Sequence, residues 1–129
     1  MAITAQFSNT PLCPVAQVSV ANTARDGTGT IVTVFTASGS GARIDSVVVQ
    51  ATGTTTAGMV RLFINDGTNT RLFDEIPVSA ITPSGTVAAF KQTQLYSATQ
   101  PIILPSGHSL RASTNNAETF NIIPFGGAF

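Results

Sequence analysis

The sequence predicts an all-β fold, a single-domain antiparallel β-sandwich of jelly-roll or related Greek-key type. Threonine accounts for 19 of the 129 residues, and threonine and valine suit a pleated, half-buried surface because branching at Cβ restricts χ1. The apolar residues occur in short runs separated by glycine and proline, which is typical of sandwiches. No window keeps apolar residues at helical spacing without a glycine, a proline or a threonine cluster interrupting it. A chain of this length fits one domain around one core.

An extended N-terminal arm, residues 1–16, precedes the sandwich domain, residues 17–129. Pro11 and Pro14 indicate the arm, because proline lacks the backbone N–H that a helix or a central strand requires. The first residues, Met1–Phe7, lack the basic start and long apolar run of a signal peptide. No stretch approaches the roughly 20 apolar residues of a membrane-spanning helix. We therefore expect a protein that is made in the cytoplasm and does not contact a membrane.

The first strands of the sandwich are separated by glycine-rich turns. Residues 17–21 alternate polar and apolar side chains, as a strand with one buried face does. The segment 26–30 is a turn, because aspartate favours turn positions and glycine accepts a positive φ. Residues 31–36 form the next strand. After another glycine-rich loop, residues 42–52 form a third, with the buried-type run Val47–Val49.

The clearest hairpin joins residues 59–64 to residues 70–76 through the loop Asn65–Asn69. Pairing the last residue of the first strand with the first residue of the second gives the expected register. That register sets Arg61 against Phe73 and Phe63 against Arg71. Each such cation–aromatic pair is worth about 0.5–1 kcal/mol when exposed.

Four more strands complete the sandwich, bounded by prolines and glycines. The longest covers residues 87–97, and a short apolar strand, residues 101–105, begins and ends at proline. Residues 109–113 and 120–125 are the last two strands. The glycine-containing residues 126–129 are expected to trail from the fold.

Six basic and six acidic side chains give a formal net charge of zero. Proteins that bind nucleic acid cluster lysine and arginine to neutralise phosphates, whereas the arginines here are widely spread. A neutral surface of threonine, serine, asparagine and glutamine suits a protein that contacts other subunits. Cys13 is the only cysteine, so an intramolecular disulfide is impossible, and we expect it to be a small, buried or half-buried apolar residue.

His108 is the only histidine, and it could act as a general base for Ser106 or Ser109. Such a site needs a third orienting group and an oxyanion hole, and the sequence has no Gly-x-Ser-x-Gly motif. We therefore interpret His108 as a turn histidine, exposed between strands. No catalytic residue, cofactor or small-molecule substrate is expected.

The carboxylates Asp74 and Glu75 are adjacent, so on a strand they point to opposite faces and form no acid–base pair. Glu75 is expected to form an ion pair with Arg71 or Arg61, or an intersubunit contact. The loop Asn65–Asn69 offers oxygen ligands but lacks the further acidic positions and the closing glutamate of a calcium loop. It is expected to be a plain turn, and no metal site is predicted.

Both ends of the chain carry apolar residues that are costly to leave in water. Either they cover their own sandwich or they dock on a neighbour, and a charge-poor body favours both equally, because interface cores are depleted in charge. The residues expected at a subunit interface are Phe7, Pro11, Leu12, Arg61, Arg71, Glu75, Phe125 and Phe129.

Three stretches of the chain resemble small virion proteins of tailed bacteriophages. Arg25–Phe35 and Gly53–Ile64 are similar to segments of such proteins. Leu104–Ala112 (Leu-Pro-Ser-Gly-His-Ser-Leu-Arg-Ala) resembles a Leu-Pro-x-Gly-x-Ser-Leu-x-Ala corner of their β-sandwiches. The resemblance spans most of residues 22–125.

This resemblance implies a non-enzymatic structural protein of the virion, of the capsid cement or decoration type. Such proteins are commonly β-sandwich homotrimers that stabilise the head by binding between major-capsid subunits, often through an extended N-terminal arm. The implied partners are further copies of this chain and a phage major capsid protein, with no nucleic acid or membrane. The alternative is a receptor- or carbohydrate-binding tip domain of a phage fibre. Such a domain would use exposed aromatics such as Tyr96 and loops such as residues 52–58. Without such a role, residues 52–58 are expected to be a solvated connection.

Overall fold

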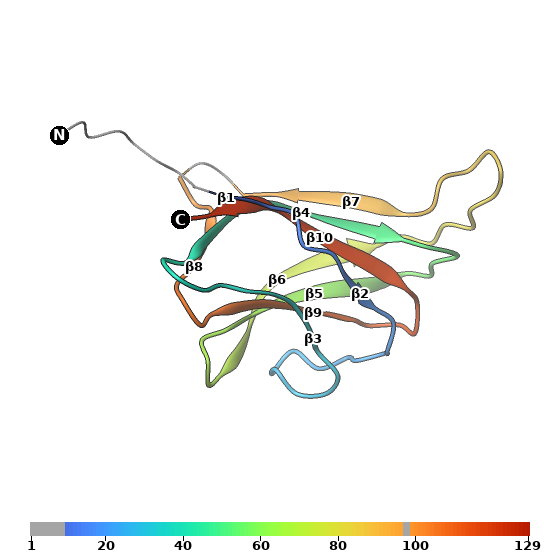
Figure 1. Cartoon of the computed structure of the whole chain (residues 1–129). Coiled ribbons are helices and arrows are strands. Elements are labelled where there is room, and N and C mark those ends of the chain that lie inside the picture. Colours follow the sequence, from blue (N-terminus) through green and yellow to red (C-terminus); the bar gives the residue numbers. More distant parts are fainter. Residues whose placement is uncertain (1–9, 97–98) are drawn as a thin grey trace.

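The computed structural model describes residues 10–96 and 99–129, which fold into two antiparallel sheets that face each other (Figure 1). The strands are β1 (Thr10–Leu12), β2 (Ala16–Val18), β3 (Val32–Thr36), β4 (Ala42–Ala51), β5 (Gly58–Asn65), β6 (Thr70–Val78), β7 (Lys91–Leu95), β8 (Ile102–Leu104), β9 (Ser109–Thr114) and β10 (Phe120–Ala128). The predicted all-β fold, an antiparallel β-sandwich, is confirmed. None of the described residues forms a helix, so this part of the chain holds no apolar helix that could cross a membrane.

Sheet A has six strands, with β10 and β4 paired at its centre. The short strands β1 and β2 follow each other along the free side of β10. On the other side of the sheet, β8 and β7 pair with successive parts of β4. Each lateral edge of sheet A is therefore shared by two short strands.

Sheet B has four strands in the order β3-β9-β5-β6. The chain passes from one sheet to the other at most connections, and only β1–β2, β5–β6 and β7–β8 stay within one sheet. Strands that pair are therefore mostly distant in the sequence, as β10 and β4 are. This interleaving ties the two sheets into one unit.

The core lies between the sheets and is built by alternating residues. Val47 and Val49 of β4 are fully buried, whereas Val48 between them points outward and is half-buried. Phe90 and Phe120 meet edge to face inside, with ring centroids 6.4 Å apart. Sheet B contributes buried side chains from β5, β6 and β9 to the same cluster: Val60, Leu62, Ile76, Leu110 and Ala112.

The C-terminal residues continue the last strand, so the expectation that they trail from the fold is wrong. β10 extends beyond Phe125 to Ala128, and Gly126 lies opposite Ile44. A Cβ on Gly126 would overlap the carbonyl oxygen of Arg43. Glycine is therefore required here by the close approach of β10 to β4, and it does not end the strand.

Part of the predicted arm belongs to sheet A. Thr10–Leu12 form β1 and pair with Gly126–Ala128 of β10, and β2 follows from Ala16. Residues 1–9 lie outside the described residues. The division of the chain into an arm and a domain at residue 16 remains a prediction.

Cys13 is exposed, so the expectation of a buried or half-buried cysteine is wrong. It lies in the short connection between β1 and β2, where Pro14 follows it. This connection runs along the outer edge of the sheet, beside β10. Its position at the edge explains its exposure.

The β5–β6 hairpin forms where predicted but in a different register. Asn65, and not Ile64, lies opposite Thr70. The Asn65 side chain closes the turn, because its Nδ2 donates to Thr70 Oγ1 at 2.8 Å and its Oδ1 accepts from the Gly67 N–H at 2.7 Å. These two bonds shorten the loop by one residue at its start.

The register change moves the charged residues of the hairpin. Phe73 of β6 is an extra residue without a partner on β5, because Phe63 lies opposite Leu72 and Leu62 lies opposite Asp74. Arg61 therefore lies opposite Glu75. The predicted stacking of Arg61 on Phe73 and of Phe63 on Arg71 is therefore wrong. An ion pair across the strands replaces two cation–aromatic contacts.

Candidate interaction surfaces

The outward face of sheet B is closed by the loop that precedes β3. Arg61 and Phe63 alternate with the core residues of β5 and so point away from the core, yet they are only 3% and 0% exposed. Figure 1 shows the light-blue loop, residues 19–31, running past this side of sheet B. The backbone of Gly27 in this loop lies against Thr70 of β6. The loop therefore covers a face that would otherwise meet solvent.

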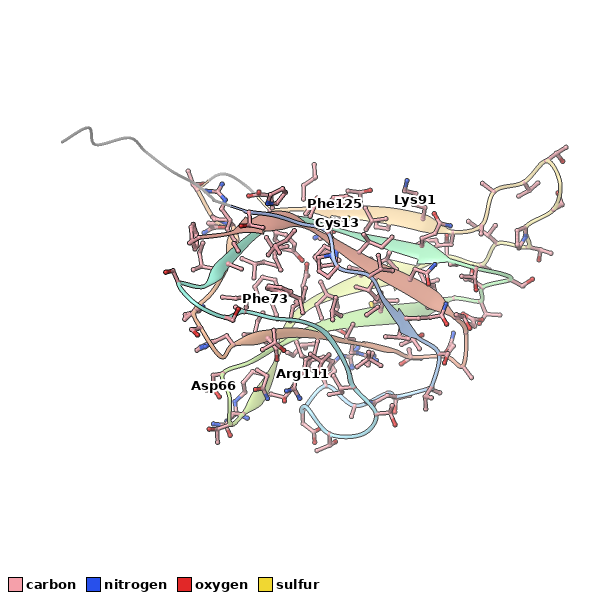
Figure 2. All side chains as sticks on the ribbon, viewed as in Figure 1. Cys13, Asp66, Phe73, Lys91, Arg111 and Phe125 are labelled. Atoms are coloured by element: carbon pink, nitrogen blue, oxygen red, sulfur yellow. The ribbon has the colours of Figure 1, made fainter. Side chains whose placement is uncertain are left out.

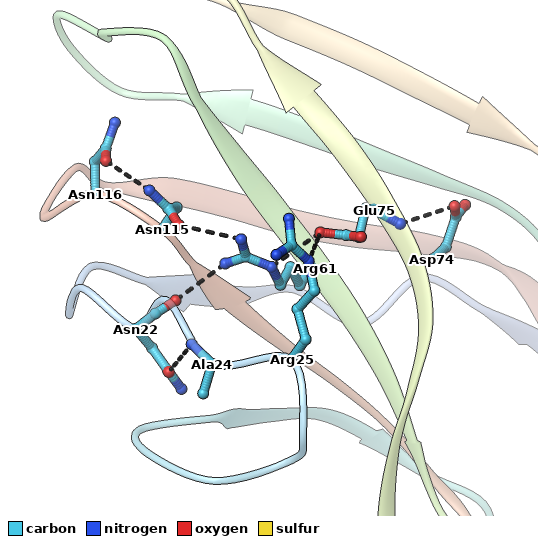
Figure 3. Close-up of polar contacts among 8 residues, drawn as sticks. All are labelled: Asn22, Ala24, Arg25, Arg61, Asp74, Glu75, Asn115 and Asn116. Carbon is cyan, nitrogen blue, oxygen red and sulfur yellow. Dashed lines mark hydrogen bonds and ion pairs between the residues drawn. The ribbon is translucent and has the colours of Figure 1, made fainter.

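Arg61 joins three elements through its guanidinium (Figure 3). Its Nε donates to Glu75 Oε2 on β6 at 3.0 Å, and its Nη1 donates to the carbonyl oxygen of Asn22 in the loop at 3.2 Å. Its Nη2 donates to Asn115 Oδ1, after β9, at 3.1 Å. A buried charge is tolerated here because a carboxylate and further acceptors meet its fixed donors.

Glu75 receives two arginines on one oxygen. Arg25 Nε donates to Glu75 Oε2 at 2.8 Å, next to the bond from Arg61. The hydrogen bond from Arg25 is the largest influence and holds the pKa of Glu75 below its ordinary value; Arg61 lowers that pKa further, against partial desolvation. The predicted ion pair between Glu75 and Arg61 is confirmed.

Asn22 gives the covering loop its shape. Its Nδ2 donates to the carbonyl oxygens of Thr28 at 2.9 Å and Thr30 at 3.0 Å, and its Oδ1 accepts from the Ala24 N–H at 3.0 Å. A Cβ on Gly29 would come within 2.7 Å of the Asn22 amide. One buried side chain thus holds both ends of the loop segment together.

The threonine-rich loop 52–58 is anchored at its C-terminal half. Glu118 Oε2 accepts from the Thr56 N–H at 2.8 Å and from Thr56 Oγ1 at 2.7 Å. Asn116 Nδ2 donates to the Ala57 carbonyl oxygen at 3.1 Å, and Thr55 Oγ1 donates to a backbone carbonyl on the β6 side. This loop is therefore a structured connection with several side-chain bonds.

The outward face of sheet A, in contrast, is open and carries apolar side chains. Phe125, Leu95 and Ile103 are 43%, 76% and 51% exposed, and Val48 and Ile123 are half-buried. We call these five residues the sheet A patch. Figure 2 labels Phe125 on this side of the molecule, away from sheet B.

Strand registers place the sheet A patch around β4. Phe125 and Leu95 lie on either side of Ser46, and Ile123 lies opposite Val48. Residues directly opposite each other in antiparallel strands share a face. The patch therefore spans neighbouring strands of one face.

Few charges border the sheet A patch. Arg43 Nε and Asp45 Oδ1 form an ion pair at 2.7 Å on β4. Lys91 projects from the start of β7 on the same side as Phe125 (Figure 2). An apolar centre with a sparse charged rim is the composition that protein interfaces favour.

Among the described residues, no hydrogen bond joins His108 to Ser106 or Ser109 as a nucleophile–base pair would require. Ser109 Oγ accepts a hydrogen bond from Arg111 Nε at 3.0 Å, and the buried Nδ1 of His108 has no hydrogen-bond partner among the described residues. His108 is half-buried, so the expectation of an exposed histidine is wrong. Its turn packs against Ala37, whose N–H donates to the His108 carbonyl oxygen at 2.9 Å.

The loop Asn65–Asn69 is a turn closed by its own side chains, as predicted. Asp66 Oδ1 accepts from the N–H groups of Thr68 at 3.0 Å and Asn69 at 2.8 Å, and these bonds lower the pKa of Asp66. Across residues 10–96 and 99–129, no group of three or more His, Cys, Asp and Glu side chains could hold a metal ion.

Asp74 and Glu75 point to opposite faces, as predicted. Asp74 Oδ2 accepts from the Tyr96 hydroxyl at 3.0 Å, on the side away from the Arg61 cluster. Burial, and then the charge of Asp74, raise the pKa of Tyr96. The Tyr96 ring is half-buried and lies 5.5 Å from the ring of Phe73.

The predicted interface residues near the chain ends lie beside sheet A. Pro11, Phe125 and Phe129 are exposed, and Leu12 is half-buried against the core. Phe7 lies outside the described residues. Of the predicted interface residues on β5 and β6, Arg71 is exposed. Arg61 and Glu75 instead form an ion pair beneath the loop 19–31.

Comparison with solved structures gives a likeness to a phage protein. No family model and no curated protein matches the chain. A solved pentameric capsid protein isolated from metagenomic phage sequences is similar with a TM-score of 0.40 and 17% identity. The likeness covers 89% of this chain and 61% of that chain.

Sequence reasoning paired Glu75 with Arg61 but missed the other residues that close sheet B. Arg25 and Glu75 are 50 positions apart, and Arg61 and Asn115 are 54 apart, so no local pattern connects them. The sheet A patch did leave a signal in consecutive apolar residues, as in the run Val47–Val49. Where a strand alternates across two faces, such runs indicate apolar side chains on both.

Proposed function

We propose that the protein is a non-enzymatic structural protein of a phage virion, an auxiliary capsid protein of the cement or decoration type. It stabilises the head by binding between major-capsid subunits and is located in the virion. The sequence resemblance of residues 22–125 to small phage virion proteins motivates this proposal. The sheet A patch is the structural observation that carries it.

The patch supports a protein partner because of what surrounds it. The other outward face, on sheet B, is covered by residues 19–31, whereas Phe125, Leu95 and Ile103 remain exposed. Burial of apolar surface contributes roughly 25 cal/mol per Å², so covering these side chains would favour association. Large-area contact of this kind needs no reactive group.

The strand order is consistent with this role. The order β2-β10-β4-β7 facing β3-β9-β5-β6 supports assigning the sandwich to the jelly-roll type, which occurs in viral capsid domains among others. A fold alone does not fix a function. The order therefore adds to the proposal without carrying it.

The remaining parts of the proposal concern assembly. The partners are a phage major capsid protein and further copies of this chain, arranged as a homotrimer. Pro11, Phe125 and Phe129, all exposed beside sheet A, together with Phe7, are the residues we propose for these contacts. Nucleic acid, membrane and small-molecule substrates are not partners in this proposal.

Heating of phage particles tests the proposed function. Particles of the phage that carries this gene should release DNA at a lower temperature when the gene is deleted, because a ligand of the assembled shell stabilises it over dissociated subunits. Adding back the purified protein should restore the release temperature, and adding an unrelated small β-protein should not. Equal release temperatures, with the protein missing from purified wild-type particles, would contradict the proposal.

A second outcome would favour the fibre-tip alternative. In that case the purified protein would block adsorption of the phage to its host, and head stability would not depend on it. The Tyr96 ring is half-buried and hydrogen-bonded to Asp74, so it does not offer the exposed stacking face that this alternative needs.

A further inference from the structure

The outer edge of β7 differs from the other longer edges of the two sheets. Edge strands of natural sheets are usually blunted by proline, a bulge or short length. β3 has a register irregularity at its pairing with β9, and β6 contains Pro77 and an irregularity at Phe73. β1, β2 and β8 are three residues long. β7 has five residues, no proline and an unbroken register with β4, and the exposed Lys91 at its start is its one charged residue.

The backbone groups on that free edge can be assigned from the β4–β7 ladder. The Tyr96 N–H donates to the Asp45 carbonyl oxygen at 2.9 Å, and the Phe90 carbonyl oxygen accepts from the Ala51 N–H at 2.8 Å. Backbone groups of alternate residues face the same neighbour in an antiparallel pair. Even-numbered residues of β7 therefore face β4, and Lys91, Thr93 and Leu95 present their N–H and C=O groups outward. The outward carbonyl oxygen of Thr93 accepts a hydrogen bond from Gln92 Nε2 at 3.3 Å, which pairing with a second strand would replace.

The sequence of β7 is nearly symmetric about its centre. Thr93 is flanked by Gln92 and Gln94, and the strand ends in Lys91 and Leu95. Gln94 and Gln92 lie opposite Val47 and Val49 of β4, which places both glutamine side chains on the inward side of sheet A. Gln92 is exposed there, and Gln94 is half-buried.

We propose that β7 pairs with β7 of a second copy of this chain, antiparallel and centred on Thr93. Thr93 then exchanges backbone hydrogen bonds with Thr93 of the other copy, and Lys91 exchanges them with Leu95. Gln92 lies opposite Gln94 in the closer, non-hydrogen-bonded pairs, where the two side-chain amides can donate to and accept from each other. The contact is two-fold symmetric, so it is distinct from the three-fold contacts of the proposed trimer and would join two such trimers. It does not depend on the proposed virion role.

This pairing also accounts for the exposure of Leu95. At 76%, Leu95 is the most exposed large apolar side chain of the described residues. In the paired strands it lies beside Lys91 of the other copy, whose aliphatic stem can cover it while the ammonium group stays in water. The outward N–H groups of β7 and the exposed leucine are thus satisfied by the same partner.

Sedimentation velocity of the full chain at several concentrations tests the pairing. Thr93→Pro removes an outward N–H and leaves the bonds to β4 intact, so it should halve the mass of the assembly. The matched control, Thr93→Val, keeps the backbone donor and the branched Cβ and should leave the mass unchanged. A wild-type chain that is monomeric at all concentrations, or a folded Thr93→Pro variant of unchanged mass, would overturn the proposal.

Charge substitutions test the register independently, in case proline at position 93 prevents folding. Gln92→Glu with Gln94→Glu places like charges opposite each other twice and should weaken association about tenfold. Gln92→Lys with Gln94→Glu places opposite charges together in both pairs and should restore it. Equal dissociation constants for the two double variants would overturn the pairing.

Discussion

Arg61 shows how one residue organises a face of the molecule. Its side chain points outward from β5, a position at which a solvated side chain is expected. It is nevertheless only 3% exposed, because the loop 19–31 lies over it. Once the loop is in place, its guanidinium needs acceptors, and Glu75, Asn22 and Asn115 supply them. Removing one acceptor would leave a buried donor unsatisfied, which typically costs about 1–3 kcal/mol.

The shared carboxylate of this cluster predicts a pH dependence of stability. The pKa of Glu75 in the folded protein lies below its ordinary value of 4.5, so the unfolded chain binds the proton first as the pH falls. The stabilisation from Glu75 is therefore complete above about pH 4.5 and is lost as the pH falls through the folded pKa. Urea unfolding from pH 7 to pH 3 should show the advantage of wild type over Glu75→Gln shrinking in that range.

Arg25 provides the control for this pH effect, because its hydrogen bond is the largest cause of the lowered pKa. In an Arg25→Gln background, the difference between Glu75 and its glutamine variant should depend less on pH. Parallel stability curves for wild type and Glu75→Gln across the acid range would contradict the assignment.

At the scale of elements, alternation and turn residues predicted most strands. The run Val47–Val49 and the prolines around β8 marked their strands correctly, because strand period and proline restrictions are local. The hairpin register was not predictable in the same way. Asn65 closes its turn with two side-chain hydrogen bonds. Such side-chain bonds compete with the backbone pairing that loop length alone would predict.

The candidate surfaces were less accessible to sequence reasoning than the strands. The expected interface residues Phe125 and Pro11 are exposed beside sheet A, because their position at a strand end and in the arm was visible locally. The closure of sheet B was not visible, since the sequence predicted a strand over residues 17–21 and a plain turn over residues 26–30. Which face of a sandwich stays open depends on where such a connection crosses, and that is a long-range property.

The extension of β10 gives a prediction at this scale. Gly126→Ala should destabilise the fold by at least about 2 kcal/mol, because the added Cβ would meet the backbone of β4 at Arg43. The matched control is Gly85→Ala, where nothing lies within 4 Å of the added atom. Chemical denaturation of both variants checks this, and equal stabilities would show that β10 ends before Gly126.

At the scale of the whole molecule, one outward face of the sandwich is covered and the other is exposed. Sheet B is sealed by its own chain, which makes it a stable support, while sheet A offers an apolar patch with few charges. Pairing of β7 with a second copy would join two such patches into one wider surface, because the outward faces of paired strands are continuous. A bivalent surface of this kind gains avidity on a repetitive lattice if both patches can engage at once.

Substitution of the patch separates binding from folding. Phe125→Asp and Ile103→Asp should each leave the chain folded, since these side chains are 43% and 51% exposed and lie outside the core. Each should weaken co-sedimentation with capsid shells that lack the protein by about tenfold or more, because an apolar contact worth about 1.5 kcal/mol or more is replaced by a desolvated charge. Val87→Asp is the matched control, as Val87 is similarly exposed, at 47%, but lies in the connection between β6 and β7. If Val87→Asp weakened binding as much as the two patch variants, the capsid would contact a different surface, and the role of the sheet A patch would be wrong.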